Sequence, residues 1–207
     1  MPTKHFESGK SRLSSLLNKL DRIKLSGLLL QSTLSTLSEA NMISDIIVVS
    51  SDVRAKRIAK MYAALFLDEG PERGVNNAVT IANNYFYEAG ADATIVVPQD
   101  LPLVVSEDID MMCKYAKEYH KCLVICPSVR YDGSNALLRR PPKLIESSYD
   151  NNSFAMHVDA ARKAAAKINI ILSKRMMRDL DTIEDAEYLV KVPTMCKSIV
   201  YLRSKMQ

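Results

Sequence analysis

A short buried strand that ends in Pro98-Gln99-Asp100 constrains the fold of this chain more than any other stretch. Residues 94–97 are β-branched or apolar, as is typical of a strand covered on both faces of a parallel sheet. Pro102 and the acidic segment 106–110 then indicate a loop and the start of a helix. Asp100 would therefore lie at the carboxyl end of a strand, where open α/β sheets bind ligands and where a carboxylate can hold Mg²⁺ against a nucleotide. An Asx-type turn is the structural alternative.

The rest of the chain alternates between strand and helix patterns. Strands are predicted at residues 43–51, 65–67, 94–97, 122–127, 136–139 and 168–172. Helices are predicted at 16–40 (continuous or broken at Gly27), 53–62, 76–89, 106–119, 154–166 and 183–190, with a further short one after Pro193. This alternation predicts one α/β domain over residues 1–207, with a mostly parallel, Rossmann-like sheet and helices on both faces.

Composition narrows the class of protein. A hydrophobic fraction of 47% is enough for a full core, and a net charge of +4 is too mild to indicate nucleic-acid binding but suits an anionic small molecule. The four cysteines form no CxxC pair, which indicates reduced core thiols. No apolar run approaches 18 residues and no signal peptide is evident, so we expect a cytoplasmic protein without membrane spans.

The first fifteen residues hold three cations, Lys4, Lys10 and Arg12, and the small residues Ser8, Gly9 and Ser11 keep the backbone between them unobstructed. Cations beside exposed backbone N–H groups shortly before a helix can form a phosphate cradle. The GxxxxGK[ST] spacing of a P-loop is absent. A solvated basic terminus is the alternative interpretation.

A second acidic site precedes the late helix, at Asp179 and Asp181. Side chains two residues apart in extended backbone face the same side. If the sheet brings this pair to Asp100, the three carboxylates could hold one or two Mg²⁺ ions that bridge phosphate groups. Alternatively, Asp181 and its neighbours only favour the N-terminus of the helix electrostatically.

Six segments in order carry a resemblance to a known family. They are Lys10-Ser-Arg-Leu13, Gly74-Val-Asn-Asn-Ala78, Pro98-Gln-Asp-Leu-Pro102, Asp132-Gly-Ser-Asn-Ala-Leu137, Ser153-Phe-Ala-Met-His157 and Asp179-Leu-Asp-Thr-Ile-Glu-Asp185. Together they resemble the 2-phospho-L-lactate guanylyltransferases of coenzyme F420 biosynthesis. The resemblance implies a nucleotidyltransferase fold like that of nucleotide-diphospho-sugar transferases. It also implies that 2-phospho-L-lactate or phosphoenolpyruvate is joined to GMP from GTP, with release of pyrophosphate.

The resemblance also implies roles for individual residues. Lys4, Lys10 and Arg12 would be the catalytic cations that hold phosphates, Lys10 and Arg12 on the nucleotide and Lys4 on the acceptor. Asp100, Asp179 and Asp181 would bind Mg²⁺, with Asp100 also contacting the nucleotide. Asn76 would contact the base or ribose, and Asn135 and Ser153 would line the acceptor pocket. His157 would serve either helix packing or chemistry. The implied partners are GTP and the phosphorylated acid, without nucleic acid or membrane, and a homodimer is left open.

Two departures from the family qualify the resemblance. Family members have an apolar strand before the basic loop, whereas only Met1 precedes Pro2 here, so we expect either a truncated and less stable chain or another segment in that place. Asp150 stands where the family usually has Gly, and its charge could repel an anionic acceptor. A molybdenum-cofactor guanylyltransferase and a catalytically inactive nucleotide-binding protein remain the rival interpretations.

Overall fold

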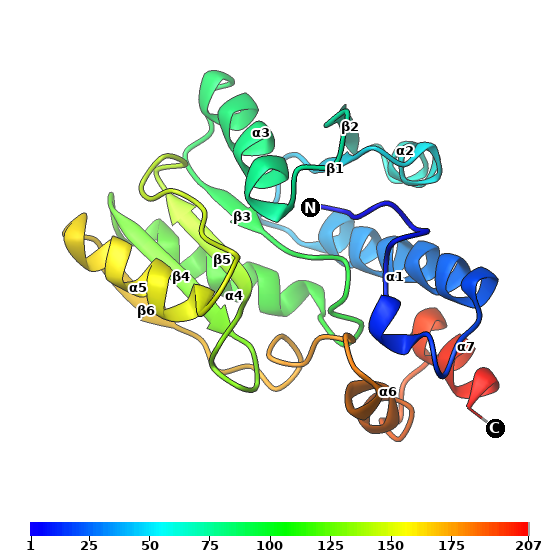
Figure 1. The fold of residues 1–207 in the computed structure, drawn as a ribbon. Coiled ribbons are helices and arrows are strands. Elements are labelled where there is room, and N and C mark those ends of the chain that lie inside the picture. The colour runs from blue at the N-terminus through cyan, green and yellow to red at the C-terminus, as the bar shows by residue number, and fades with distance from the viewer. Residues whose placement is uncertain (207) are drawn as a thin grey trace.

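Strands and helices alternate along most of the chain in the computed structural model, which describes residues 1–206 (Figure 1). The strands are β1 (Ile47–Ser50), β2 (Leu65–Asp68), β3 (Thr94–Val96), β4 (Cys122–Pro127), β5 (Ser134–Arg140) and β6 (Lys167–Ile170). The helices are a 3₁₀ turn (Ser11–Leu13), α1 (Lys19–Glu39), α2 (Val53–Met61), α3 (Val75–Glu88), α4 (Ser106–Lys117), α5 (Ser153–Lys163), α6 (Ile183–Leu189) and α7 (Lys197–Lys205). The predicted order of elements is therefore confirmed.

The strands form two sheets. β1 and β2 pair in parallel, and the second sheet has the order β3-β5-β4-β6. β4 and β6 are parallel, whereas β5 runs antiparallel to both of its neighbours, β3 and β4. The α/β class and mostly parallel sheet are thus confirmed. Because β5 is reversed, its first residues lie at the same edge of the sheet as the last residues of β3 and β4.

Helices cover both faces of the sheet, as the sequence predicted. All six residues of β4 are buried, and they alternate between two cores. Val124 packs with residues of α1, α2 and α4, while Leu123 and Ile125 pack with Val79 of α3 and Val158 of α5. The near-continuous apolar sequence of β4 follows from this arrangement, since neither face of the strand meets water.

Helix α1 is continuous through Gly27, which resolves the two possibilities left by the sequence. Its N-terminus is capped by Asn18, whose Oδ1 accepts from the backbone N–H of Asp21 at 2.9 Å. Gly27 faces the N-terminal segment, since a Cβ at this position would lie 3.5 Å from the Phe6 ring, in ordinary van der Waals contact. Leu34 packs in the core of the sheet and Leu29 in a second cluster with α6 and α7, so α1 joins these two parts (Figure 1).

The N-terminal residues extend the β1 edge. Met1 donates to the Ile47 carbonyl at 2.7 Å, Val49 donates to the Met1 carbonyl at 3.0 Å, and Thr3 donates to the Val49 carbonyl at 2.9 Å. Residues 1–3 therefore run parallel to β1, between β1 and β3, where the sequence analysis expected a strand or its substitute. They occupy only one end of this space.

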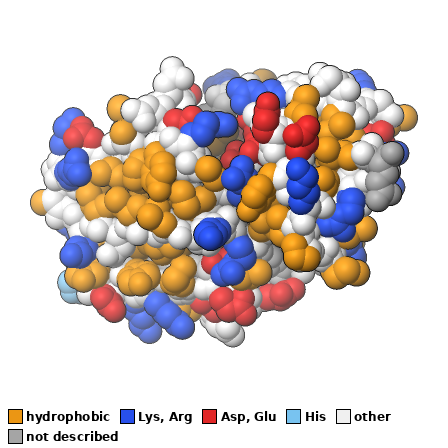
Figure 2. Space-filling view, turned by 90° about the horizontal axis from the view of Figure 1, so that it is seen from below, with side chains coloured by type: hydrophobic (Ala, Val, Ile, Leu, Met, Phe, Trp, Pro, Cys, Tyr) orange, Lys and Arg blue, Asp and Glu red, His pale blue; other side chains and the backbone are white. Residues whose placement is uncertain are grey.

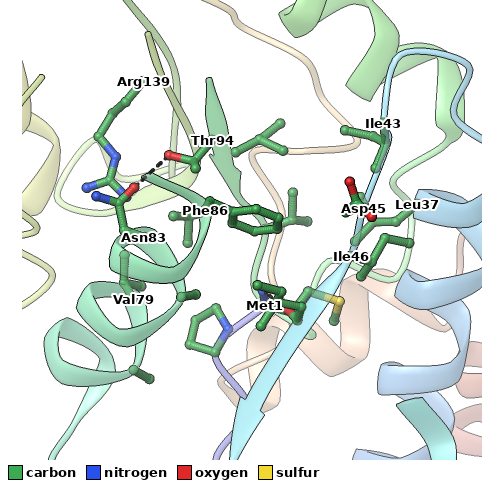
Figure 3. Close-up of a pocket in the computed structure, with 17 residues that line it drawn as sticks. Met1, Leu37, Ile43, Asp45, Ile46, Val79, Asn83, Phe86, Thr94 and Arg139 are labelled. Carbon is green, nitrogen blue, oxygen red and sulfur yellow. Dashed lines mark hydrogen bonds between the residues drawn. The ribbon is translucent and has the colours of Figure 1, made fainter. Parts of the chain in front are cut away.

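The remaining space between β1 and β3 is an apolar cavity (Figure 3). Leu37 and Ile46 lie on one side of it, and Val79 and Phe86 of α3 lie on the other, with Met1 between them. β1 and β3 consequently belong to separate sheets. The lower stability that we expect for this arrangement stays a prediction.

Two further expectations concern the thiols and the surface. All four cysteines are free, and Cys122 and Cys126 are buried on β4, as predicted.

Within residues 1–206 no helix has both the length and the apolar character required to cross a bilayer. On the face shown in Figure 2, basic and acidic side chains are interspersed with apolar ones and do not form a single basic surface.

The role of α1 can be tested by truncating one of its leucines. Leu34 is fully buried, whereas Leu20 on the same helix is 76% exposed. We expect Leu34→Ala to lower the free energy of unfolding by about 2–5 kcal/mol, because it removes buried methyl groups and leaves a cavity. Leu20→Ala should change it by less than about 0.5 kcal/mol. Urea denaturation of both variants measures the difference, and equal effects would contradict the described packing.

Candidate active site

A polar cavity of about 290 Å³ opens at the edge of the sheet where β3 ends and β5 begins. Its wall combines the N-terminal segment, the turn after β3, the start of β5 and the segment before α6. Of the residues predicted for the site, Lys4, Lys10, Asp100, Asn135, Ser153, Asp179 and Asp181 line this cavity. Groups that are up to 177 residues apart in the sequence are thereby brought to one place.

Lys10 is fixed by backbone and side chain together. Its backbone is left-handed, with φ 54°, which is uncommon for a residue with a Cβ. Its ammonium lies 2.8 Å from the Asp100 carboxylate, and only 5% of the Lys10 side chain is exposed. A buried cation requires such a partner. The pair therefore anchors the basic loop on the turn that follows β3.

Asp179 lies beside this pair in an unfavourable environment for a negative charge. Burial and the nearby charge of Asp100 raise the pKa of Asp179 to about 6. One of its oxygens is 3.5 Å from the amide nitrogen of Asn135, which also donates to the Met176 carbonyl at 3.0 Å. Asn135 is thus held by the backbone and faces a carboxylate that lacks a full partner.

Arg12 does not itself line the cavity, but it pairs with Asp181, which does. The guanidinium of Arg12 donates to the carboxylate of Asp181, and 67% of the Arg12 side chain is exposed. An exposed pair of this kind contributes little to stability. Arg12 is therefore available to exchange this partner for another anion.

The residues present fit a divalent cation in charge and in donor type. Asp100, Asp179 and Asp181 supply carboxylate oxygens, the ligands that Mg²⁺ prefers. Burial and the charge of Asp100 both raise the pKa of Asp179. Among residues 1–206, however, no three acidic, His or Cys side chains are arranged closely enough to hold a metal ion as they stand. Mg²⁺ binding at these residues stays a prediction.

Two serines, Ser134 and Ser153, also line the cavity. Ser153, the first residue of α5, accepts through Oγ from the backbone N–H of Ser134 at 2.9 Å. Ser134 begins β5, and Gly133 precedes it in a turn where the glycine N–H donates to the Ser128 hydroxyl at 3.1 Å. These contacts join the start of a strand to the start of a helix and present two hydroxyl groups at the cavity.

Asn76 and Asp150 have a structural arrangement that the sequence did not reveal. The Asn76 amide nitrogen donates to the Asp150 carboxylate at 3.0 Å, and its amide oxygen accepts from the backbone N–H of Tyr149 at 2.8 Å. Neither Asn76 nor Asp150 lines the cavity. In this structure Asn76 joins α3 to the loop before α5, and its predicted contact with the base or ribose remains untested.

The sequence analysis did not single out some residues that line the cavity. Ser134 and Tyr149 belong to it, as does Glu72 in the loop before α3. Ser134 is part of the Gly-Ser-Asn segment and could have been noticed there. Glu72 lies in an acidic, Gly-containing loop with no pattern that marks one residue.

The fold is similar to that of solved proteins named as nucleotide-diphospho-sugar and nucleotidyl transferases. A putative nucleotide-diphospho-sugar transferase from Desulfovibrio desulfuricans has a similar structure, with a TM-score of 0.80 and 16% identity over 98% of this chain and 92% of that one. A nucleotidyl transferase from Methanothermobacter matches with a TM-score of 0.65 and 13% identity, over 98% and 97% of the two chains. At these identities the likeness concerns the fold.

The sequence comparisons identify the family. Residues 1–206 match the family described as "Guanylyl transferase CofC like", and the chain belongs to it. A phosphoenolpyruvate guanylyltransferase from Rubrobacter xylanophilus is 32% identical over 89% of this chain and 89% of its own length. A 2-phospho-L-lactate guanylyltransferase from Methanocaldococcus jannaschii is 31% identical over 89% of this chain and 78% of its own length. The predicted family resemblance is confirmed.

The environment of Asp179 predicts a cost in stability. The pKa of Asp179 is raised from the unfolded value of 3.8 to about 6. The contribution of Asp179 to the free energy of unfolding is therefore most favourable below pH 3.8 and is lost as the pH rises through 6. Asp179→Asn should therefore raise the free energy of unfolding at pH 8, without added metal, by about 1–3 kcal/mol. The gain should shrink toward pH 4.5.

Urea denaturation of the wild type and the variant at both pH values measures this effect. Asp159→Asn is the control, since Asp159 is an exposed carboxylate on α5 that pairs with Lys163 at 2.8 Å. It should leave the free energy of unfolding nearly unchanged at both pH values, because exposed ion pairs contribute little to stability. A destabilised Asp179→Asn protein at pH 8 would contradict the described environment.

Proposed function

We propose that this protein transfers GMP from GTP to a phosphorylated three-carbon acid, phosphoenolpyruvate or 2-phospho-L-lactate, with release of pyrophosphate, in coenzyme F420 biosynthesis. The observation that carries the proposal is the meeting of Lys4 and Lys10 with three carboxylates in one cavity of a nucleotidyltransferase-like fold, with Arg12 paired to one of these carboxylates, Asp181. The names of the relatives support the choice of guanylyl transfer and of the two acids.

The reaction needs no nucleophile or strong base from the protein. An oxygen of the acceptor phosphate attacks the α-phosphorus of GTP, a P–O bond forms, and the bond to the pyrophosphate oxygen breaks. The attacking phosphate is already ionised near neutral pH. Catalysis then consists of holding two polyanions in line and neutralising their charge, for which the basic loop and the cavity are suited.

Each side of the cavity has a separate task in this proposal. Lys10 and Arg12 bind phosphates of the nucleotide, and Lys4, Asn135 and Ser153 bind the acceptor. In the structure Lys10 and Arg12 are each paired with a carboxylate, Asp100 and Asp181. Mg²⁺ held by Asp100, Asp179 and Asp181 would supply positive charge to the phosphates. It would also release both cationic side chains from these pairs.

Asp150 is compatible with an anionic acceptor. Its carboxylate accepts from the Asn76 amide and lies outside the residues that line the cavity. The repulsion that the sequence suggested is therefore expected to be weak. Asp150→Asn should leave the KM for the acceptor within about threefold of the wild-type value, since exposed charges at a distance are largely screened.

The decisive experiment measures pyrophosphate release from GTP with Mg²⁺ in the presence of phosphoenolpyruvate, of 2-phospho-L-lactate, or of no acceptor. Release that depends on one acid supports the proposal and identifies the acceptor. CTP in place of GTP tests the choice of base. Binding of GTP without transfer to either acid would contradict the proposed reaction and indicate a nucleotide-binding protein.

The assignment of the carboxylates makes a second prediction. Asp100→Asn keeps the shape of the side chain but removes the charge that pairs with Lys10 and would bind Mg²⁺. Turnover should fall by about 10²–10³-fold, as when a preorganised electrostatic partner is removed. Asp150→Asn is the matched control, because it makes the same chemical change outside the cavity. Near-normal turnover of Asp100→Asn would refute the metal assignment.

A further inference from the structure

His157 lies on α5 behind the cavity and is completely buried, yet both of its ring nitrogens have a partner. The backbone N–H of Ser148 donates to Nε2 at 3.0 Å. Nδ1 lies 2.9 Å from the hydroxyl of Ser134. The imidazole thus bridges the loop before α5 and the first residue of β5.

These two contacts determine the position of the imidazole proton. A backbone N–H can only donate, so Nε2 must be the unprotonated nitrogen. Burial and the positive charge of Arg139 lower the pKa of His157 to about 4, so the ring is neutral near pH 7. A neutral ring with a free Nε2 carries its proton on Nδ1. His157 therefore donates to Ser134.

The hydroxyl of Ser134 is consequently restricted to one role. It accepts from His157 Nδ1 at 2.9 Å and from the Ser153 hydroxyl at 3.3 Å, which uses both acceptor positions of the oxygen. Its own proton remains free to donate, and Ser134 is one of the residues that line the cavity. The hydroxyl can therefore offer a hydrogen bond to a group that binds there.

We propose that His157 is a positioning residue that makes the Ser134 hydroxyl an obligatory donor to an anionic oxygen of the phosphorylated acid. The inference rests on the proposed function, because it assigns the cavity wall formed by Ser134 and Ser153 to the acceptor. The competing interpretation is that His157 only holds the loop through Ser148. That loop has an independent anchor, since Asn76 accepts from the neighbouring N–H of Tyr149 at 2.8 Å.

Two substitutions of His157 separate these interpretations. Asparagine places an amide N–H near the position of Nδ1 and can still donate to Ser134. Glutamine reaches the position of Nε2 and can still accept from Ser148. If His157 acts through Ser134, His157→Gln should raise the KM for the acceptor about 10- to 100-fold, the effect of losing a hydrogen bond to a charged group. His157→Asn should stay within about threefold of the wild type.

The KM for GTP should change little in both variants, because the nucleotide is bound by the cations. A double variant completes the test. The KM for the acceptor should be no higher in Ser134→Ala combined with His157→Gln than in Ser134→Ala alone. The proposal would be overturned if the KM for the acceptor rose equally in the two His157 variants, or if its increases were additive in the double variant. Either result would indicate that His157 only holds the loop through Ser148.

The tautomer can be measured without any activity, which separates this inference from the proposed function. The chain has three histidines, so long-range ¹H–¹⁵N spectra of the imidazoles can be assigned with the His157→Asn variant. We expect a protonated Nδ1 and an unprotonated Nε2 at pH 7. A protonated Nε2 would overturn the proposal.

Titration with phosphoenolpyruvate alone, followed by calorimetry, tests acceptor binding in every variant. If the wild type bound phosphoenolpyruvate without turnover, only the proposed reaction would be refuted.

Discussion

The ion pair between Lys10 and Asp100 holds the candidate site together. It joins a loop at the start of the chain to the turn after β3, and its ammonium is almost completely removed from water. Such a cation is tolerable only beside its partner, so the left-handed backbone at Lys10 and the turn geometry at Asp100 must be formed together. Asp179 lies next to this pair, and its burial, together with the nearby charge of Asp100, raises the pKa of Asp179.

The reversed strand β5 completes the site from the other direction. In an all-parallel sheet, the segment that starts this strand would lie at the opposite edge. Because β5 is antiparallel to β3 and β4, Ser134 and Asn135 at its beginning come to the edge where β3 ends. Ser153 at the start of α5 then meets them through a hydrogen bond to the Ser134 backbone. Hydroxyl and amide groups thus line the same cavity as the cations and carboxylates.

Much of this could be predicted from the sequence because the signals are local. Apolar runs predicted β3 and β4 nearly to the residue, and the Thr182 to Asp185 capping pattern marked the start of α6.

Features that depend on distant partners could not be predicted. Gly27 lies within a continuous α1, where it packs near the Phe6 ring, and one of the two arginines at the end of β5, Arg139, is 1% exposed. Nothing in their spacing distinguishes Arg139 from Arg140.

The pairing of residues 1–3 with β1 fixes where the basic loop begins along the edge of the sheet. Parallel pairing shifts in steps of two residues, since a step of one would turn every side chain to the other face. A two-residue slip would move Lys4 by about 7 Å along the edge of the sheet. Three backbone hydrogen bonds between Met1, Thr3 and β1 exclude that slip. The register of this pairing therefore fixes the position of Lys4 at the cavity, independently of any ligand.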